Sequence, residues 1–230
     1  MTICLQGGGE FSPGCRVMDA DLVRRAGGRV VVSALAGSPG RDYDTATANG
    51  VRHFRDVGAG DVVGAPDARG DPAGAVSALA KARLLVLPGG SPSRLLAALS
   101  ETPVGDLLAQ AVADGVVLMG ASAGAMVLGS WTVLPDRRSD GAPEVTLALG
   151  LAGDLAVIPH WSGSSGRGDW LRALQVLPDS TVLLGVPEES GVVVEDGVLT
   201  AVGSAPTRLL GLDLDLEPGQ SWTLPGQALT

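Results

Sequence analysis

The segment from Val116 to Gly129 constrains the fold of this chain more than any other feature of its sequence. It consists of a short apolar run, a turn of very small residues and a second apolar run, in the order VVLMGASAGAMVLG. This pattern predicts a buried strand that turns sharply into a helix, because small residues at Gly120 and Gly124 tolerate a close approach of the backbone. A strand followed directly by a helix is typical of an α/β fold with a parallel sheet.

The same order of strand, glycine-rich turn and helix recurs before this segment. Apolar residues 3–5 run into Gly7-Gly8-Gly9-Glu10, and the almost wholly apolar residues 83–87 run into Pro88-Gly89-Gly90. Helical patterns are expected over residues 15–26, 43–55, 73–82, 94–100, 104–113 and 169–175. We therefore predict an α/β fold, a three-layer sandwich with a mostly parallel central sheet.

In the second half of the chain, the sequence predicts shorter strands and one long loop. Further buried strands are expected at 155–157 and 181–184, and a C-terminal antiparallel hairpin around Asp196-Gly197. Residues 131–144 are rich in Asp, Arg, Ser, Gly and Pro, so we expect an irregular loop over the sheet. Because the sequence contains no repeat or domain linker, residues 1–230 are expected to form a single domain.

The composition argues against several classes of partner. The formal net charge is −9, and no basic run is longer than a pair such as Arg137-Arg138, so binding to nucleic-acid phosphates or to an anionic membrane is not expected. Aromatic residues make up 3% of the chain and offer little surface for stacking of unpaired bases. The N-terminus lacks a basic segment followed by a long apolar run, which favours a soluble cytoplasmic protein.

Neither a metal nor a dinucleotide cofactor is expected. Cys4 and Cys15 are the only cysteines, too few for an all-cysteine metal site, and free thiols are expected. The first glycine turn nearly matches a dinucleotide fingerprint, but Ser12 replaces its last glycine. The turn can still bring its backbone close to a small ligand, although an ordinary turn fits the same residues.

Residues Gly120 to Gly124 have the G-x-S-x-G spacing of a nucleophile elbow. In such a turn the central Ser122 has a strained backbone and its hydroxyl projects above the edge of the sheet. The N–H group of Ala123 would lie at the start of a helix, where a free donor and partial positive charge stabilise an oxyanion. The alternative is a small-residue turn that only packs against a neighbouring strand.

A serine nucleophile needs a base, and imidazole is the usual one because it titrates near neutral pH. The chain contains two histidines. His160 follows the strand 155–157 and would project over the carboxyl edge of the sheet toward Ser122, so it is the candidate base. A histidine that merely packs at the strand end is the alternative. His53 lies on a charged helix segment, where we expect it to be solvated or to cap the helix.

The base in turn needs an acceptor that orients it. Glu188 and Glu189 follow the next apolar strand, again at a carboxyl edge of the sheet. Because adjacent residues in an extended segment face opposite sides, we expect Glu188 to face His160 and Glu189 to point away. Asp136 and Asp140 compete for this role, since the loop after the elbow could fold back. A further alternative is that Glu188 and Glu189 are exposed loop residues and neither orients the base.

These residues resemble the serine peptidases that include dipeptidase E (aspartyl dipeptidase) and the cyanophycinases, on a class I glutamine amidotransferase-like, flavodoxin-like scaffold. The shared motifs occur in the family's order: Gly7-Gly8-Gly9-Glu10, Pro88-Gly89-Gly90, Gly120 to Ala125, Pro159-His160-Trp161 and Gly185-Val186-Pro187-Glu188. The order serine, histidine, acid differs from that of the α/β-hydrolases. Related amidotransferases carry Cys in place of Ser122, which argues against glutamine hydrolysis.

The resemblance implies a peptidase that cleaves small peptides or isopeptides through an acyl-enzyme, without a metal or organic cofactor. It implies Ser122 as nucleophile, His160 as base and Glu188 as the third member, with the N–H groups of Gly90 and Ala123 as the oxyanion hole. Two rivals stay open: a non-catalytic module that binds a small ligand, and an esterase or acyltransferase with the same triad. Whether the protein forms a homodimer is also left open by the sequence.

Two segments depart from the family's pattern. Ser91-Pro92-Ser93 stands where these peptidases often have Asn or Asp followed by Gln or Thr. The segment after the histidine is usually rich in arginine, whereas Arg167 and Arg172 are the basic residues near it here. Specificity for Asp-containing substrates therefore does not follow from the resemblance.

Overall fold

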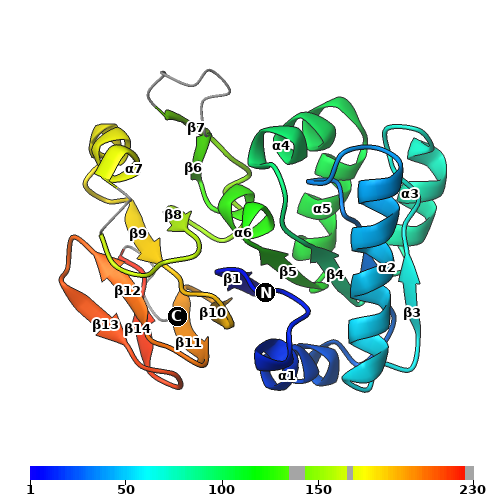
Figure 1. Cartoon of the computed structure of the whole chain (residues 1–230), viewed down its shortest axis with the longest axis horizontal. Helices are drawn as coiled ribbons and strands as arrows, with labels where there is room; N and C mark the ends of the chain where they lie inside the picture. The colour runs from blue at the N-terminus through cyan, green and yellow to red at the C-terminus, as the bar shows by residue number, and fades with distance from the viewer. Residues whose placement is uncertain (135–142, 165–167, 226–230) are drawn as a thin grey trace.

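The computed structural model describes residues 1–134, 143–164 and 168–225. Within these residues, the larger sheet has eight strands in the order β14-β11-β10-β1-β5-β4-β2-β3 (Figure 1). Its strands are β1 (Thr2–Gln6), β2 (Val30–Val32), β3 (Val62–Gly64), β4 (Leu84–Leu87), β5 (Val117–Ala121), β10 (Ser190–Glu195), β11 (Val198–Gly203) and β14 (Ser221–Thr223). Strands β1 to β5 all run parallel, and the predicted α/β fold is confirmed.

An antiparallel edge completes this sheet beside β1. Strand β10 pairs antiparallel with β1, β11 with β10, and β14 with β11. The hairpin between β10 and β11 turns at Asp196 and Gly197, whose φ angles are 48° and 79°. Positive φ at both central residues is what a two-residue hairpin turn requires, and Asp-Gly meets that requirement at low cost. The predicted C-terminal hairpin is confirmed.

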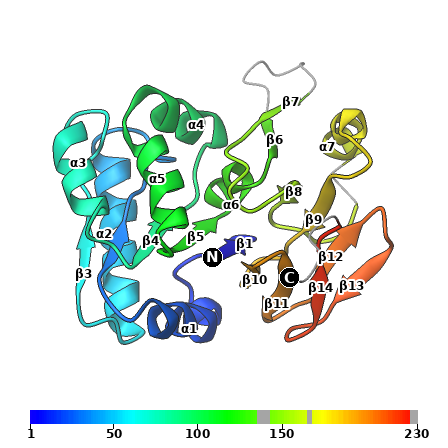
Figure 2. The ribbon, with the colours of Figure 1, turned by 180° about the vertical axis from the view of Figure 1, so that it is seen from behind.

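Helices cover both faces of the larger sheet (Figures 1 and 2). The first layer is α1 (Arg16–Ala26) and α2 (Arg41–Asp56); the second is α3 (Pro72–Leu79), α4 (Pro92–Glu101), α5 (Val104–Ala113) and α6 (Ala123–Leu128). Alternation along β4 explains this division. Leu84 and Val86 pack in one core with residues of α1 and α2, whereas Leu85 and Leu87 pack in another with residues of α3 to α6.

A second sheet lies beside α6 and was not expected from the sequence (Figure 1). Its strands have the order β13-β12-β9-β8-β6-β7. They are β6 (Trp131–Leu134), β7 (Glu144–Leu147), β8 (Leu155–Ile158), β9 (Val182–Gly185), β12 (Thr207–Leu210) and β13 (Leu214–Leu216). A short helix, α7 (Gly168–Ala173), lies between β8 and β9 in the chain.

The expectation that residues 131–144 form an irregular loop is wrong at both ends. Residues Trp131–Leu134 form β6, and Glu144–Leu147 form β7, which pairs with it antiparallel. Aromatic and β-branched residues favour such strands, but the turn-forming residues between them concealed the pattern. Residues 135–142, which include Asp136 and Asp140, lie outside the described part of the chain.

The core is continuous between the two sheets. One cluster of buried side chains contains Leu85 and Leu118 from the larger sheet together with Leu155, Leu184 and Leu209 from the second. This shared packing fixes the carboxyl ends of β5 and β8 relative to each other. Among the described residues, no helix is both long and apolar enough to cross a membrane.

Candidate active site

Ser122 lies in the sharp turn between β5 and α6. Its φ and ψ angles are 49° and −109°, a conformation that residues with a side chain rarely adopt. The turn is possible because its neighbours lack side chains: a Cβ atom on Gly120 would lie 2.5 Å from the carbonyl carbon of Gly124, and one on Gly124 would lie 2.0 Å from the carbonyl oxygen of Leu87. The elbow geometry expected from the spacing is present.

His160 follows β8 and faces this turn. Its Nε2 atom lies 2.8 Å from the Oγ atom of Ser122. The ring rests on the glycine turn after β1, since a Cβ atom on Gly8 would lie 2.3 Å from the Cε1 atom of His160. Any side chain at Gly8 would therefore displace the imidazole.

Glu188 extends this chain of contacts. Its Oε1 atom lies 3.0 Å from the Nδ1 atom of His160, within the distance expected for a hydrogen bond. Glu189 points elsewhere, because its Oε1 atom accepts a hydrogen bond of 2.7 Å from the hydroxyl of Ser12. The structure thus brings Ser122, His160 and Glu188 together in the order expected from the sequence. The side chains of His160 and Glu188 are 40% and 64% exposed, so the group opens to solvent.

The end of β1 forms backbone hydrogen bonds with the three segments that contain Ser122, His160 and Glu188. Three consecutive carbonyl groups, those of residues 6–8, accept hydrogen bonds from the N–H groups of Ser122 (2.9 Å), His160 (2.7 Å) and Glu189 (2.9 Å) respectively. These three donors come from segments that are far apart in the sequence. The glycine turn after β1 is therefore a common support for the site, which is more than the ordinary turn that its residues also allowed.

The two N–H groups expected to form an oxyanion hole lie in turns beside Ser122. No hydrogen bond between described residues engages the N–H group of Gly90 or of Ala123. The neighbouring N–H group of Gly89 instead donates to the Oε1 atom of Glu10, at 2.8 Å. Glu10 was part of the motif after β1, but the sequence offered no role for it. A charged side chain within a glycine turn at a strand end was the available signal.

The expectation that His53 is solvated or caps a helix is wrong. His53 is 6% exposed, and its Nε2 atom lies 2.7 Å from the Oδ2 atom of the fully buried Asp19. The amide of Gln6 donates to the other oxygen of Asp19, at 2.5 Å. His53 lies on the inner face of α2, beside the buried Phe54, while the charged residues next to them, Arg52 and Arg55, are exposed.

Both cysteines are free thiols in buried positions. Burial raises the pKa of the Cys15 thiol to about 11 and raises the pKa of the Cys4 thiol still further. Both are therefore neutral at physiological pH, and neither has the character of a reactive thiolate. In the described part of the chain, no group of three or more His, Cys, Asp and Glu side chains could hold a metal ion.

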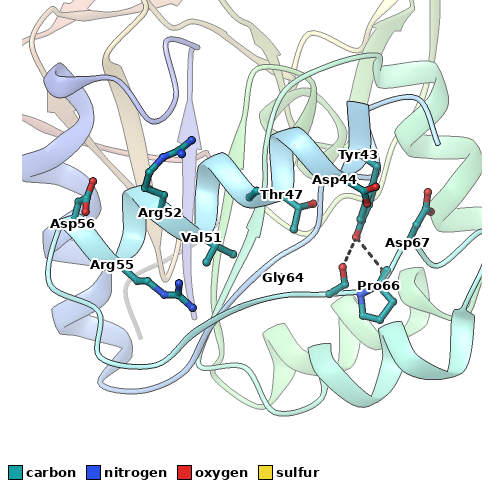
Figure 3. Close-up of a pocket in the computed structure, with 12 residues that line it drawn as sticks. Tyr43, Asp44, Thr47, Val51, Arg52, Arg55, Asp56, Gly64, Pro66 and Asp67 are labelled. Carbon is teal, nitrogen blue, oxygen red and sulfur yellow. Dashed lines mark hydrogen bonds between the residues drawn. The ribbon is translucent and has the colours of Figure 1, made fainter. Parts of the chain in front are cut away.

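A cavity of about 590 Å³ lies elsewhere, between α2 and the segment that follows β3 (Figure 3). Its walls include Thr47, Arg55 and Asp67, and the hydroxyl of Tyr43 closes one end, 2.9 Å from the carbonyl oxygen of Ala65. Strand β3 is the edge of the larger sheet, with β2 and β4 between it and β5. None of the residues gathered around Ser122 lines this cavity, so it is separate from the candidate active site.

Comparison with known proteins gives consistent results. A model of peptidase family S51 matches residues 29–202. The cyanophycinase of Trichormus variabilis is 29% identical over 130 residues, which cover 54% of this chain and 43% of the relative. The cyanophycinase of Synechococcus elongatus is 28% identical over 215 residues, which cover 89% of this chain and 66% of the relative. The chain thus matches less than two thirds of the length of either relative.

A solved structure supports the same fold. The crystal structure of a peptidase from an acI-B1 actinobacterium aligns with this chain with a TM-score of 0.78. The alignment covers 96% of both chains at 23% sequence identity. This likeness confirms the α/β sandwich.

Proposed function

The chain belongs to peptidase family S51, and from this we propose that it is a serine-type peptidase that hydrolyses small peptides or isopeptides, as dipeptidase E or a cyanophycinase does. The observation that carries the proposal is the line of contacts from Ser122 through His160 to Glu188, at 2.8 Å and 3.0 Å. A hydroxyl, an imidazole and a carboxylate in this order are the components of a serine triad.

In the proposed reaction, the Oγ atom of Ser122 attacks the carbonyl carbon of the scissile bond while Nε2 of His160 takes the hydroxyl proton. The tetrahedral intermediate collapses when the C–N bond breaks, and His160 returns the proton to the departing amine. A water molecule then attacks the acyl-enzyme, again giving its proton to His160. The bond between Oγ and the acyl carbon then breaks, His160 returns the proton to Oγ, and release of the acid product regenerates Ser122.

Glu188 orients the base in this proposal. When the N–H at Nδ1 of His160 donates to this carboxylate, the imidazole is held in the tautomer whose Nε2 accepts the proton of Ser122. The same carboxylate stabilises the imidazolium that forms in the transition state. Its exposure to solvent weakens the electrostatic part of this effect, so the orientation of the ring is the main contribution.

The N–H groups of Gly90 and Ala123 would bind the oxyanion of the tetrahedral intermediate. Each such donor contributes about 3 kcal/mol to stabilisation of the transition state. That no described residue accepts a hydrogen bond from either group supports this assignment. We further propose that residues 1–230 act as a single catalytic domain, because one buried cluster spans both sheets.

A fluorophosphonate probe and a dipeptide library test the proposed function together. The probe forms a bond with an activated serine, so we expect labelling of the wild-type protein and none of the Ser122→Ala variant. Hydrolysis in the library, lost in Ser122→Ala, would identify the peptidase and its substrate. Labelling without amide hydrolysis would favour the esterase or acyltransferase, and the absence of labelling would favour the ligand-binding module.

A further inference from the structure

Glu10 joins two turns that are distant in the sequence. It is the last residue of the Gly-Gly-Gly-Glu turn after β1, and it is half-buried. Its Oε1 atom accepts a hydrogen bond of 2.8 Å from the N–H group of Gly89, which lies 79 residues away in the turn after β4. The contact therefore joins the glycine turn after β1, which packs against His160, to the turn after β4, which contains Gly90.

The carboxylate of Glu10 lies close to the candidate nucleophile. A Cβ atom on Gly89 would lie 2.5 Å from the Oε1 atom of Glu10 and 3.2 Å from the Cβ atom of Ser122. The side chains of Glu10 and Ser122 therefore border the same glycine. A larger residue at Gly89 would separate them.

The Gly89-Gly90 segment has little conformational preference of its own. Glycine populates most of the backbone map, and Gly90 has a φ of 141°, which other residues rarely adopt. On its far side the turn is held by Ala36, whose carbonyl oxygen accepts a hydrogen bond of 2.9 Å from the N–H group of Ser91. On its near side the N–H group of Gly89 is held by Glu10. The peptide unit between Gly89 and Gly90 thus lies between two fixed N–H groups.

We propose that Glu10 is a positioning residue that fixes the turn after β4, so that the N–H group of Gly90 points to the oxyanion. This inference rests on the proposed function of Gly90. The acceptor atom of Glu10, and not its negative charge, supports the reaction in this proposal, because a negative charge beside a developing oxyanion would oppose its formation. An uncharged acceptor of the same length should therefore serve as well as the carboxylate.

Three substitutions separate the acceptor from the charge. Glu10→Ala removes the acceptor, Glu10→Asp keeps the charge but withdraws the acceptor by one methylene, and Glu10→Gln keeps the acceptor without the charge. We expect kcat to fall about ten- to a hundredfold in Glu10→Ala and Glu10→Asp, with KM within about threefold of wild type, since an oxyanion donor acts in the transition state. Glu10→Gln should recover most of kcat.

The matched control is Glu101→Ala, which removes a carboxylate from the exposed end of α4 and should leave both constants unchanged. Three kinetic outcomes would overturn the proposal. One is a wild-type kcat in both Glu10→Ala and Glu10→Asp. Another is an equal loss in Glu10→Gln and Glu10→Ala, which would assign the effect to charge. A rise in KM alone would likewise show that Glu10 acts on substrate binding.

Amide hydrogen exchange tests the same contact without any substrate. The Gly89 amide proton should exchange slowly in the wild type and in Glu10→Gln, and at least about tenfold faster in Glu10→Ala. Unchanged exchange at Gly89 would refute the positioning role even in a protein that hydrolyses peptides. If exchange responds as expected but the protein is not labelled by a fluorophosphonate, the contact stands and the proposed function fails.

Discussion

Three residues of the site have backbone conformations that are uncommon for residues with side chains. The φ angles of Ser122, His160 and Glu189 are 49°, 52° and 53°. Such conformations cost about 1–3 kcal/mol each and persist where the surroundings hold them. Here each N–H group is bound by a carbonyl of residues 6–8. Local strain and long-range hydrogen bonds together set the positions of the reactive side chains.

Replacing Ser122 with Ala should abolish turnover and leave the fold intact. The hydroxyl bonds to His160 at the open surface of the site and contributes little to packing. Loss of a serine nucleophile usually lowers kcat on the order of a millionfold. Circular dichroism and steady-state kinetics of the purified variant would check both parts. More than about a thousandth of the wild-type rate would contradict the role of Ser122.

Glu188→Gln should lower kcat by about two to four orders of magnitude, because the amide no longer selects the tautomer of His160 that accepts a proton at Nε2. Glu189→Gln is the matched control. Its amide oxygen can still accept the hydrogen bond from Ser12, so its rate should stay close to wild type. Parallel kinetics of the two variants measure the difference. A larger effect in Glu189→Gln would transfer the role to Glu189.

Replacing His160 with Ala should remove nearly all activity, because Nε2 of His160 is the atom that takes the proton of Ser122 in the proposed reaction. Steady-state kinetics of the purified variant would measure the loss. Normal activity in His160→Ala would contradict the role of His160 as the base.

At the scale of elements, the end of β1 organises the site. Strand β1 lies between β5 and β10 in the larger sheet, so its end reaches the turn that carries Ser122 and the turn that carries Glu188 and Glu189. The side chain of Gln6 also donates to the buried Asp19 of α1, which in turn contacts His53 of α2. Two helices and the central strand are thus tied through one carboxylate.

His53→Ala should destabilise the protein through this buried contact. The substitution leaves the carboxylate of Asp19 with one fewer partner in a buried site, and removing the hydrogen-bond partner of a buried polar group costs about 1–3 kcal/mol. Urea unfolding would measure the loss in free energy of unfolding. His53→Gln, which keeps a donor, should lose less. A change below about 1 kcal/mol in His53→Ala would show that the pair contributes little.

At the scale of the whole molecule, the candidate triad spans both sheets. Ser122 follows β5 of the larger sheet, and His160 follows β8 of the second. Glu188 lies in the link between β9 and β10, which belong to different sheets. The geometry of the site therefore depends on how the two sheets pack, and the buried cluster that they share maintains it.

The stability of the whole fold should decrease above about pH 9. Burial raises the pKa of the Cys15 thiol in the folded state to about 11, from its ordinary value of 9.0. Between these values the unfolded chain loses a proton that the folded chain keeps, so the free energy of unfolding falls as pH rises, on the order of 1 kcal/mol per pH unit. Urea unfolding from pH 8 to 10.5 would test this, and Cys15→Ala should show a shallower fall. Identical slopes in both proteins would contradict it.

Features that arise from neighbouring residues could be predicted from the sequence alone. The small residues from Gly120 to Gly124 specify the turn at Ser122, because backbone sterics allow few other residues there. Asp196-Gly197 specifies the hairpin for the same kind of reason. The uninterrupted apolar run from Leu84 to Leu87 predicts a strand that is buried on both faces, and therefore helices on both sides of the larger sheet.

Features that depend on packing between distant segments are seen only in the folded protein. The burial of His53 beside Asp19, the contact of Glu10 with Gly89 and the pairing of β6 with β8 join residues between about 20 and 80 positions apart. Alternation predicted that Glu188 faces His160, but the partner that holds Glu189 on the other side, the hydroxyl of Ser12, lies 177 residues away and was not predicted. Local patterns carry no information about such partners, because the energy of each contact exists only once the chain has folded.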